Sequence, residues 1–433
     1  MYKDPSPATP ESRPAPGRAQ RSRLGRFGAL PDLAGTSFLV IGLFARLPLA
    51  MLTVGALTLV TTASSSYAAG GFAAGAVGLG SALGAPLLGF LADKRGQRIV
   101  LLVSAVLNTL AIAGLLLVTL NGDGFTGSAL ALLLAAAFLT GFTSPQIGPL
   151  ARVRWMAMTR GNPRSSLDTA LSYEGTADEL TFVLGPALVG LLASLIAPWL
   201  PLALAAALTL ILVSAFAMHH TVAYSDAGSR PGYDDGTAGD EEHLPAYRPA
   251  FVLLPVAGMI AVGTFFGSTQ AFLTAFAGQF GAPETAGLLY AMMGLSSAVA
   301  ALSVAYWSQG FSHPNRWMAS AAGMAVAAAA LALPGTITGM LVVLFILGIF
   351  VGPTMVTIFS IGSLVAPGHR LGTVMTLLAS GIVAGAAIGS ALAGALAEAS
   401  GAAGAALVPA SAAAVLLVLG AASAAALRRS GRD

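Results

Sequence analysis

Long apolar segments, each of a length that crosses a lipid bilayer, constrain this chain more than any other feature of its sequence. A helix rises 1.5 Å per residue, so about 20 apolar residues cross a hydrocarbon core of about 30 Å. We mark twelve such segments, at residues 37–63, 68–92, 99–120, 128–150, 167–195, 199–218, 250–277, 285–308, 317–334, 339–365, 373–397 and 403–427. The sequence therefore predicts an all-α integral membrane protein with twelve transmembrane helices.

Basic residues lie almost entirely outside these segments. Of the 21 Lys and Arg residues, 20 fall on the two tails or on alternate gaps, and only Arg46 lies inside a segment. The basic gaps hold Lys94, Arg95 and Arg98; Arg152, Arg154, Arg160 and Arg164; Arg230 and Arg248; Arg316; and Arg370. Because Lys and Arg mark cytoplasmic loops, we expect a multi-pass protein of the inner (cytoplasmic) membrane with cytoplasmic N- and C-termini.

Composition excludes several classes of protein. Hydrophobic residues make up 56% of the chain and charged residues 9%, far from the balance of a soluble protein. The net charge of +3 does not point to a nucleic-acid partner, because the basic residues lie where membrane insertion places them. The absence of cysteine excludes a disulfide framework and a thiolate metal site, and we expect no metal and no cofactor.

Polar interruptions divide the chain. Residues 1–35, rich in Pro, Ser and Arg, predict a disordered cytoplasmic tail, and residues 219–249, rich in Gly and acidic residues, predict a cytoplasmic linker. Between them lie six segments in residues 36–218, six more follow in residues 250–427, and residues 428–433 form a second cytoplasmic tail.

The two halves also repeat each other. Arg164 and Gly175 match Arg370 and Gly381, which lie 206 residues further on, and the pattern Gly-x-Ala-Leu-x-Gly at residues 185–190 recurs at 389–394 with a small indel. Six segments separate the copies, so both have the same orientation in the membrane. This predicts parallel halves related by an axis normal to the membrane, with a cavity between them.

The gap after the second segment reads Gly89-Phe-Leu-Ala-Asp93-Lys94-Arg95-Gly96-Gln97-Arg98. It strongly resembles the loop signature of the major facilitator superfamily of transporters. Together with the twelve segments and the half-repeat, the resemblance implies two pseudo-symmetric six-helix bundles that transport a substrate by alternating access.

The chemistry of this loop favours a gate. Gly89 allows two helices to approach closely, Gly96 allows a tight turn, and Asp93 can accept hydrogen bonds from a helix N-terminus, such as the one expected near Thr373. The resemblance implies that Asp93 latches the two halves on the cytoplasmic side. The alternative is a turn that only sets topology.

The corresponding stretch of the second half, from Tyr306 to Arg316, has no Asp and lacks the glycine spacing. We therefore expect the latch to be one-sided.

A second motif lies in the fifth segment, where Gly185, Pro186 and Gly190 resemble the Gly-Pro-x-x-Gly-Gly motif of proton-coupled antiporters in the superfamily. Val189 stands where the first of the paired glycines would be. The resemblance implies efflux, and helix packing alone is the alternative.

Four ionisable residues lie well inside the segments: Arg46, Glu174, Asp178 and Glu179. Each costs roughly 2.5–3.5 kcal/mol to insert, so we expect them to be paired or to line a polar cavity. Arg46 and Glu174 lie at similar depths, and Glu174 and Asp178 share a helix face. One arginine would then serve two acids and leave a surplus of negative charge with Glu179.

When two buried acids compete for one cation, burial and like-charge repulsion favour the neutral form of one of them. That acid can then bind and release a proton. We expect Asp178 or Glu179 to be the proton-coupling site, with Arg46 as counter-charge. The alternative is a static network that orients the first and fifth segments or reaches Arg152 and Arg154.

Further polar residues are candidates for a substrate cavity or for hydrogen bonds between helices: Asn108, Gln146, Gln270, Tyr290 and Thr357. The fourth segment, 128–150, carries no arginine, although multidrug antiporters of the superfamily usually have one there.

The leading hypothesis is a secondary active transporter that exports a small molecule against proton influx, with the proton gradient as its energy source. The alternatives are a proton symporter or uniporter for nutrient uptake and a non-transporting membrane sensor. No HExxH pair or Gly-x-Ser-x-Gly elbow is present, so we expect no enzyme. The absence of a Walker loop argues against direct ATP drive. The expected partners are a small-molecule substrate, protons and the lipid bilayer, with the protein a monomer.

Overall fold

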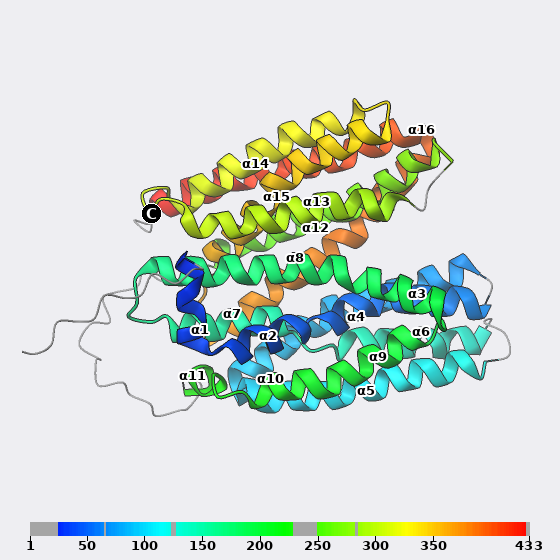
Figure 1. Ribbon diagram of the computed structural model, residues 1–433, viewed down its shortest axis with the longest axis horizontal. Helices are drawn as coiled ribbons and strands as arrows, with labels where there is room; N and C mark the ends of the chain where they lie inside the picture. The colour runs from blue at the N-terminus through cyan, green and yellow to red at the C-terminus, as the bar shows by residue number, and fades with distance from the viewer. Residues whose placement is uncertain (1–24, 65, 123–126, 228–248, 282–284, 430–433) are drawn as a thin grey trace, which may run out of the picture.

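Two helical bundles make up the protein, one from each half of the chain (Figure 1). The computed structural model describes residues 25–64, 66–122, 127–227, 249–281 and 285–429. Every regular element in these ranges is helical.

The first half of the chain forms the first bundle, with the short elements η1 and α1 before it and α11 after it. Its elements are η1 (Gly25–Gly28), α1 (Ala29–Ala34), α2 (Thr36–Phe44), α3 (Leu47–Ser64), α4 (Tyr67–Arg95), α5 (Gln97–Leu120), α6 (Gly127–Phe142), α7 (Ile147–Met158), α8 (Arg164–Leu195), α9 (Leu200–Leu208), the π-helical turn η2 (Thr209–Val213), α10 (Ser214–Met218) and α11 (Val222–Ala227).

The second bundle repeats this plan with longer continuous helices. Its elements are α12 (Pro249–Gly278), α13 (Ala286–Ser303), η4 (Val304–Tyr306), α14 (His313–Ala329), η5 (Ala330–Ala332), α15 (Ile337–Val365), η6 (Gly368–Arg370) and α16 (Leu371–Arg429).

The number of spans agrees with the sequence. Ten helices in the described ranges are long and apolar enough to cross a membrane. The last of them, Gly368–Arg428, holds two spans, because Gly401 has a φ of 69° and breaks the helix. The 17-residue α14 adds one more, which brings the total to twelve. The predicted twelve-helix, all-α membrane fold is confirmed.

Two spans of the first bundle are interrupted midway. The first span breaks between α2 and α3, at Ala45 and Arg46, and the fourth breaks between α6 and α7, where Pro145 removes a backbone donor. Arg46 and Gln146 lie at these breaks, inside the two spans.

The fourth span also corrects the sequence analysis. It continues through α7 to Met158 rather than ending near residue 150, so Arg152 and Arg154 lie in a helix and are 1% and 0% exposed. The apolar run ends at these arginines, but the helix does not, because acceptors inside the bundle bind Arg152 Nη2 and Arg154 Nε and Nη1. The expectation that the fourth span lacks an arginine is therefore wrong.

The predicted tails and linker are partly folded. Residues 29–34 form α1, whose Leu30 and Ala34 are buried, so a disordered tail over all of residues 1–35 is wrong for this part. Leu30 packs in one apolar cluster with Phe38 and Trp155. The predicted linker begins with a buried Thr221 and α11. Residues 1–24, 228–248 and 430–433 lie outside the described ranges.

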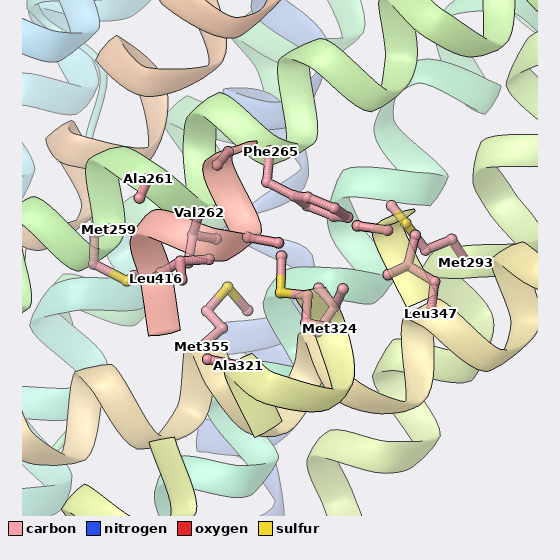
Figure 2. Close-up of a cluster of buried hydrophobic side chains, with 14 of the residues drawn as sticks. Met259, Ala261, Val262, Phe265, Met293, Ala321, Met324, Leu347, Met355 and Leu416 are labelled. Atoms are coloured by element: carbon pink, nitrogen blue, oxygen red, sulfur yellow. The ribbon is translucent and has the colours of Figure 1, made fainter. Parts of the chain in front are cut away.

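The two bundles differ in their cores. The first has two separate apolar clusters, one around Phe38 and Phe216 and the other around Met51 and Leu202. The second has one large continuous cluster rich in methionine and phenylalanine (Figure 2), with Met259, Phe265, Met293, Met324 and Met355 among its members.

Candidate functional site

A buried charge network occupies the first bundle. Arg46, at the break between α2 and α3, contacts Glu174 Oε2 with its Nη2 and lies 3.1 Å from Asp178 Oδ1 with its Nε. Its Nη1 donates to the Gly42 carbonyl oxygen at 2.8 Å. The structure thus brings Arg46, Glu174 and Asp178 together.

A second arginine completes this network. Arg152 Nη2 lies 2.7 Å from Asp178 Oδ2, and the guanidinium carbon stacks 3.9 Å from the ring centroid of Phe359 in the second bundle. Trp155 Nε1 donates to Glu174 Oε1 at 2.7 Å. Two arginines therefore balance Glu174 and Asp178, so the expectation that one arginine serves both acids is wrong, whereas Glu179 has no ion pair among the described residues. The sequence analysis allowed a network that reaches Arg152 only as its alternative, because it assigned Arg152 to a loop.

Glu179 stands apart from the balanced network. It is 6% exposed, and its Oε1 accepts a hydrogen bond from Ser297 Oγ at 2.8 Å. Ser297 belongs to α13, so this bond joins the two bundles. Glu179 forms no ion pair with any residue that the structure describes. It is a buried carboxylate whose one hydrogen-bond donor among the described residues comes from the other half of the molecule.

A small cavity lies between the bundles beside the network. Its volume is about 70 Å³, and its polar lining consists of Arg46, Arg152, Asp178, Thr181, Gln146, Ser81 and Ser380. This volume exceeds the ~10–15 Å³ that one water requires and is well below the ~300 Å³ of a pocket that encloses a drug-sized ligand. In this conformation the site admits a small group rather than a whole substrate of that size.

Of the five polar residues expected at a cavity, Gln146 lines this one. Asn108 is fully buried and donates to the Thr140 carbonyl oxygen of α6 at 2.7 Å, a bond between helices. Thr357 donates to the Pro353 carbonyl oxygen within α15 at 2.7 Å. Tyr290 packs on Phe266, and Gln270 is exposed. No group of three or more His, Asp or Glu in the described ranges could hold a metal ion.

One end of the molecule, which we call the latch end, carries the predicted gating loop. Asp93 Oδ1 accepts from the Gly372 N–H at 2.8 Å, and Oδ2 accepts from the N–H and Oγ1 of Thr373 at 2.7 and 2.6 Å. Gly372 and Thr373 open α16, where the helix dipole favours an anion. Asp93 therefore bridges the bundles in the geometry that the sequence suggested.

The structure explains why two positions of this loop are occupied by glycine. A Cβ at Gly89 would clash with Thr376 Oγ1 and lie 2.6 Å from the Gly372 carbonyl oxygen, so only glycine allows α4 and α16 this close. Gly96 has a φ of 86°, which glycine adopts without strain. The basic side chains of the loop, Lys94, Arg95 and Arg98, are exposed.

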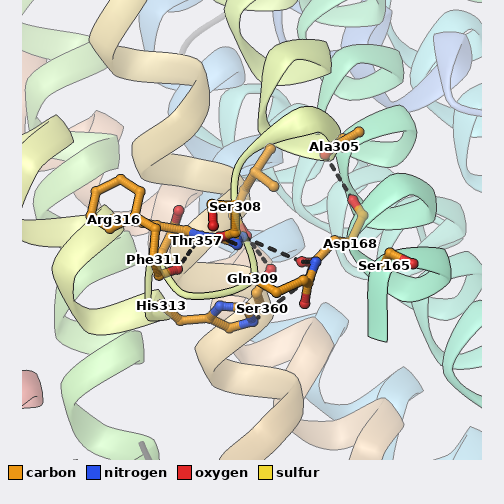
Figure 3. A network of polar contacts seen from close by, with 12 residues as sticks. Ser165, Asp168, Ala305, Ser308, Gln309, Phe311, His313, Arg316, Thr357 and Ser360 are labelled. Atoms are coloured by element: carbon orange, nitrogen blue, oxygen red, sulfur yellow. Dashed lines mark hydrogen bonds and ion pairs between the residues drawn. The ribbon is translucent and has the colours of Figure 1, made fainter. Parts of the chain in front are cut away.

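A second latch lies at the same end. Asp168 Oδ2 accepts from Arg316 Nη1 and Gln309 Nε2, each at 3.3 Å, and Oδ1 lies 3.7 Å from His313 Nε2 (Figure 3). Asp168 is in α8, and its three partners belong to the second bundle. Arg316 is held in place by the carbonyl oxygens of Phe311 and Ser308.

The expectation of a one-sided latch is therefore wrong. In both latches the acid comes from the first bundle and the donors come from the second. Sequence reasoning looked for an acid in the second half's own loop and did not consider Asp168, at the start of the fifth segment. The signal was present in Arg316, a lone basic residue at the equivalent loop position.

The N-terminal segment adds a third contact between the bundles at the latch end. Arg26 Nη1 donates to the Ala305 carbonyl oxygen at 2.6 Å, and its guanidinium carbon lies 5.7 Å from the centroid of the Tyr306 ring. The Phe27 ring lies 5.9 Å from the same ring.

The opposite end is more open, as glycines along one face of α4 show. Gly71 lies 18 residues, or five turns, before Gly89, and Gly78 lies 11 residues, or about three turns, before it, so all three share a face. A Cβ at Gly89 would clash with α16, whereas a Cβ at Gly71 or Gly78 would meet nothing within 4 Å. The bundles therefore meet at the latch end and diverge away from it.

The glycine motif of the fifth span serves packing in this conformation. A Cβ at Gly185 would lie 2.6 Å from the Ala50 side chain, so Gly185 allows α8 to approach α3 within the first bundle. Pro186 lies inside α8, and a Cβ at Gly190 would meet nothing within 4 Å.

The sequence profile of the Major Facilitator Superfamily matches residues 38–382, well over half of the chain. The chain belongs to this superfamily. Its family and its apolar helices make it a multi-pass membrane protein of a transporter family. No curated protein sequence matches the chain significantly.

Solved structures of superfamily transporters share the fold. The human organic anion transporter MFSD10 (TETRAN) has a TM-score of 0.68 at 17% identity, over 89% of this chain and 99% of that one. A bacterial homologue of the iron transporter ferroportin in its outward-facing state has a TM-score of 0.66 at 17% identity, over 90% and 99%. The transporter FucP in its outward conformation has a TM-score of 0.61 at 14% identity, over 89% and 99%.

The superfamily architecture explains the placement of the network. The buried charges and the cavity lie where the two bundles of this superfamily member meet, beyond the closed latch end. The two latches lie between a group bound there and the space outside the latch end.

Proposed function

We propose that this superfamily member is a proton-coupled exporter of a small molecule in the cytoplasmic membrane, and that Glu179 carries the proton. The observation that carries the proposal is the isolation of Glu179, a buried carboxylate between the bundles whose hydrogen-bond donor is Ser297. A buried charge without a counter-charge is costly, so protonation and deprotonation of such a group bias a conformational equilibrium.

The two other acids are less suited to this role. Glu174 and Asp178 are held by Arg46 and Arg152 in a balanced network inside one bundle, and removing a partner from a buried ion pair costs about 3–5 kcal/mol. Protonation of either acid would weaken a buried ion pair. Of the two coupling candidates in the sequence, we therefore retain Glu179 and assign Asp178 to the network.

The transport cycle follows from the latches. The positive-inside rule makes the latch end cytoplasmic, so the structure corresponds to an outward-facing state. Glu179 takes a proton from outside in this state, the bundles rock, and the proton leaves to the cytoplasm. The substrate moves in the opposite direction, which the likeness of Gly185, Pro186 and Gly190 to the antiporter motif supports.

Uptake by proton symport is the second candidate. One structural neighbour is a fucose:proton symporter from E. coli. The same Glu179 would then move its proton together with the substrate.

Proton flux in energised everted vesicles tests the proposal, with a fluorescent pH probe and a panel of amphipathic compounds and sugars. We expect compound-triggered proton release in the wild type and in Glu398→Gln, which changes an exposed glutamate at the far end of the eleventh span. Release should vanish in Glu179→Gln. Unchanged release in Glu179→Gln would refute the role of Glu179, and compound-driven proton uptake into vesicles of the opposite, right-side-out orientation would establish symport.

A further inference from the structure

The cavity between the bundles contains buried donors that the protein itself does not use. Arg152 is 1% exposed, and its Nε and Nη1 have no hydrogen-bond acceptor among the described residues, although its Nη2 binds Asp178. A buried donor without an acceptor costs about 1–3 kcal/mol, and more when the group is charged. Arg152 lines the cavity, so an acceptor placed there would offset this cost.

A second guanidinium reaches the same point of the cavity wall. A Cβ built on Gly148 would lie 3.3 Å from both Arg152 Nη1 and Arg46 Nε, and 2.9 Å from Asp178 Oδ1. Gly148 lines the cavity, and its missing side chain leaves this point open. Two cationic groups and one carboxylate therefore converge on one place.

The opposite wall supplies a matching donor. Ser380 in α16 is 6% exposed, lines the cavity, and its Oγ has no hydrogen-bond partner among the described residues. It belongs to the second bundle, whereas Arg152 belongs to the first. A group that accepts hydrogen bonds from both would join the two halves of the transporter.

The hydrogen-bond donors of the lining favour an anion. Its ionisable members are Arg46, Arg152 and Asp178. Glu174 behind Arg46 balances the network as a whole, so the preference comes from the donors of Arg152 that have no acceptor among the described residues, and not from a net charge. Guanidinium donors match the oxygens of carboxylate and phosphate groups. A cationic group would meet two arginines at short range.

We propose that the transported substrate carries an oxyanion group, a carboxylate, phosphate or sulfonate, that binds in this cavity to Arg152 and Ser380, with Arg46 beside it. The volume of about 70 Å³ suits such a head group, while the rest of the molecule extends toward the open end. The inference rests on the proposed function in one respect, that the cavity is the transport site. It supplies the substrate class and does not depend on the proton or on the direction.

Binding to the purified full-length protein in lipid nanodiscs tests the inference. The probes are benzoate, phenyl phosphate and benzenesulfonate, and the uncharged control is benzamide. We expect at least one anion to raise the midpoint of thermal unfolding in a saturable way, while benzamide does not. Stabilisation by none of the three anions, or equal stabilisation by benzamide, overturns the inference.

Two variants locate the site. Ser380→Ala removes a hydroxyl that has no partner in the described part of the chain, and it should weaken binding of the anion about tenfold. Ser363→Ala, whose hydroxyl bonds within α15 away from the cavity, should not. Arg152→Lys keeps the positive charge beside Asp178 and should weaken binding at least as much as Ser380→Ala. Unchanged affinity in both Ser380→Ala and Arg152→Lys overturns the assignment.

The same protein separates this inference from the proposed function. Glu179→Gln should bind the anion with the affinity of the wild type but release no protons. Anion binding together with proton release that persists in Glu179→Gln would refute the proton site alone. Release that depends on Glu179 and is driven only by uncharged or cationic compounds would refute the anion site alone.

Discussion

The two bundles have nearly the same architecture but different interiors. In the first, Arg46, Arg152, Glu174 and Asp178 separate two apolar clusters, whereas the second is filled by a single continuous cluster. At the level of the network, the second bundle presents to the first hydroxyl groups, from Ser297 and Ser380, and the ring of Phe359.

This difference has a mechanical consequence. All four residues of the network belong to one bundle, so a rocking motion does not separate them. Breaking a buried ion pair would cost about 3–5 kcal/mol in every cycle, whereas a single hydrogen bond is worth about 0.5–1.5 kcal/mol, or 1.5–3 when one partner is charged. Near the network, the first bundle therefore keeps its charges fixed and the second slides over them.

The largest expected effect comes from removing a charge of the first bundle. Arg46→Met leaves Glu174 without its arginine and should lower the free energy of unfolding by about 3–5 kcal/mol. The matched change in the second bundle, Met324→Leu, keeps the volume and the apolar character and should cost less than about 1.5 kcal/mol. Thermal unfolding in detergent measures both. Equal losses would show that the two interiors do not differ in this way.

Next in size is the loss of the latches. Asp93 accepts three hydrogen bonds of 2.6–2.8 Å, whereas the contacts of Asp168 are 3.3–3.7 Å. Asp93→Asn should shift the equilibrium away from the latch-closed state by about 1.5–3 kcal/mol, or roughly 10–150-fold, and Asp168→Asn should shift it less.

The chain has no cysteine, so spin labels can be attached at cysteines introduced at the exposed Arg98 and His369 to report this equilibrium. Distances that increase more in Asp168→Asn than in Asp93→Asn would reverse the ranking of the two latches.

Substitutions of two glycines on one face of α4 should have smaller effects, and the two effects should be opposite to each other. Gly89→Ala introduces a clash with α16 and should open the latch end. The side chain of Gly71→Ala meets nothing within 4 Å here, so the latch-closed state should persist. The free energy of unfolding should rise by up to about 1 kcal/mol, because alanine is the better helix former. The label pair at positions 98 and 369 distinguishes them. If both variants gave the same distances, the bundles would not diverge along α4.

The smallest effect concerns His219, which lies outside the spans and binds Ser37 and Thr221. Partial burial lowers the pKa of His219, and nearby His220 and Arg154 lower it further. The folded protein then holds this proton less tightly than the unfolded chain, so the contribution to stability is present above the ordinary pKa of 6.5 and is lost as the pH falls below it. His219→Gln should remove this small acid-induced loss, as thermal unfolding across pH can show. A variant that loses as much stability in acid as the wild type would contradict it.

Much of the fold was accessible from the sequence, because long apolar runs and the distribution of Lys and Arg follow directly from the physics of insertion. Hydropathy failed where buried polar groups are paired inside the bundle. It ended the fourth span before Arg152 and Arg154, although both lie in a helix. It also treated residues 29–34 as tail, although Leu30 packs against the first bundle.

The site was less accessible for a different reason. Local spacing placed Glu174 and Asp178 on one face and led to Arg46 at matching depth, and the loop motif led to Asp93. The pairing of Asp168 with Arg316 spans 148 residues and the contact of Glu179 with Ser297 spans 118, and no local pattern encodes either.

The most direct test of the account is the effect of pH on the conformational equilibrium without any substrate. The measurement is the distance distribution between spin labels at positions 98 and 369 in liposomes, at acidic and alkaline pH, in the wild type and in Glu179→Gln. The account predicts that the balance between latch-closed and latch-open states depends on pH in the wild type and becomes independent of pH in the variant. A variant that retains the full response to pH would contradict it.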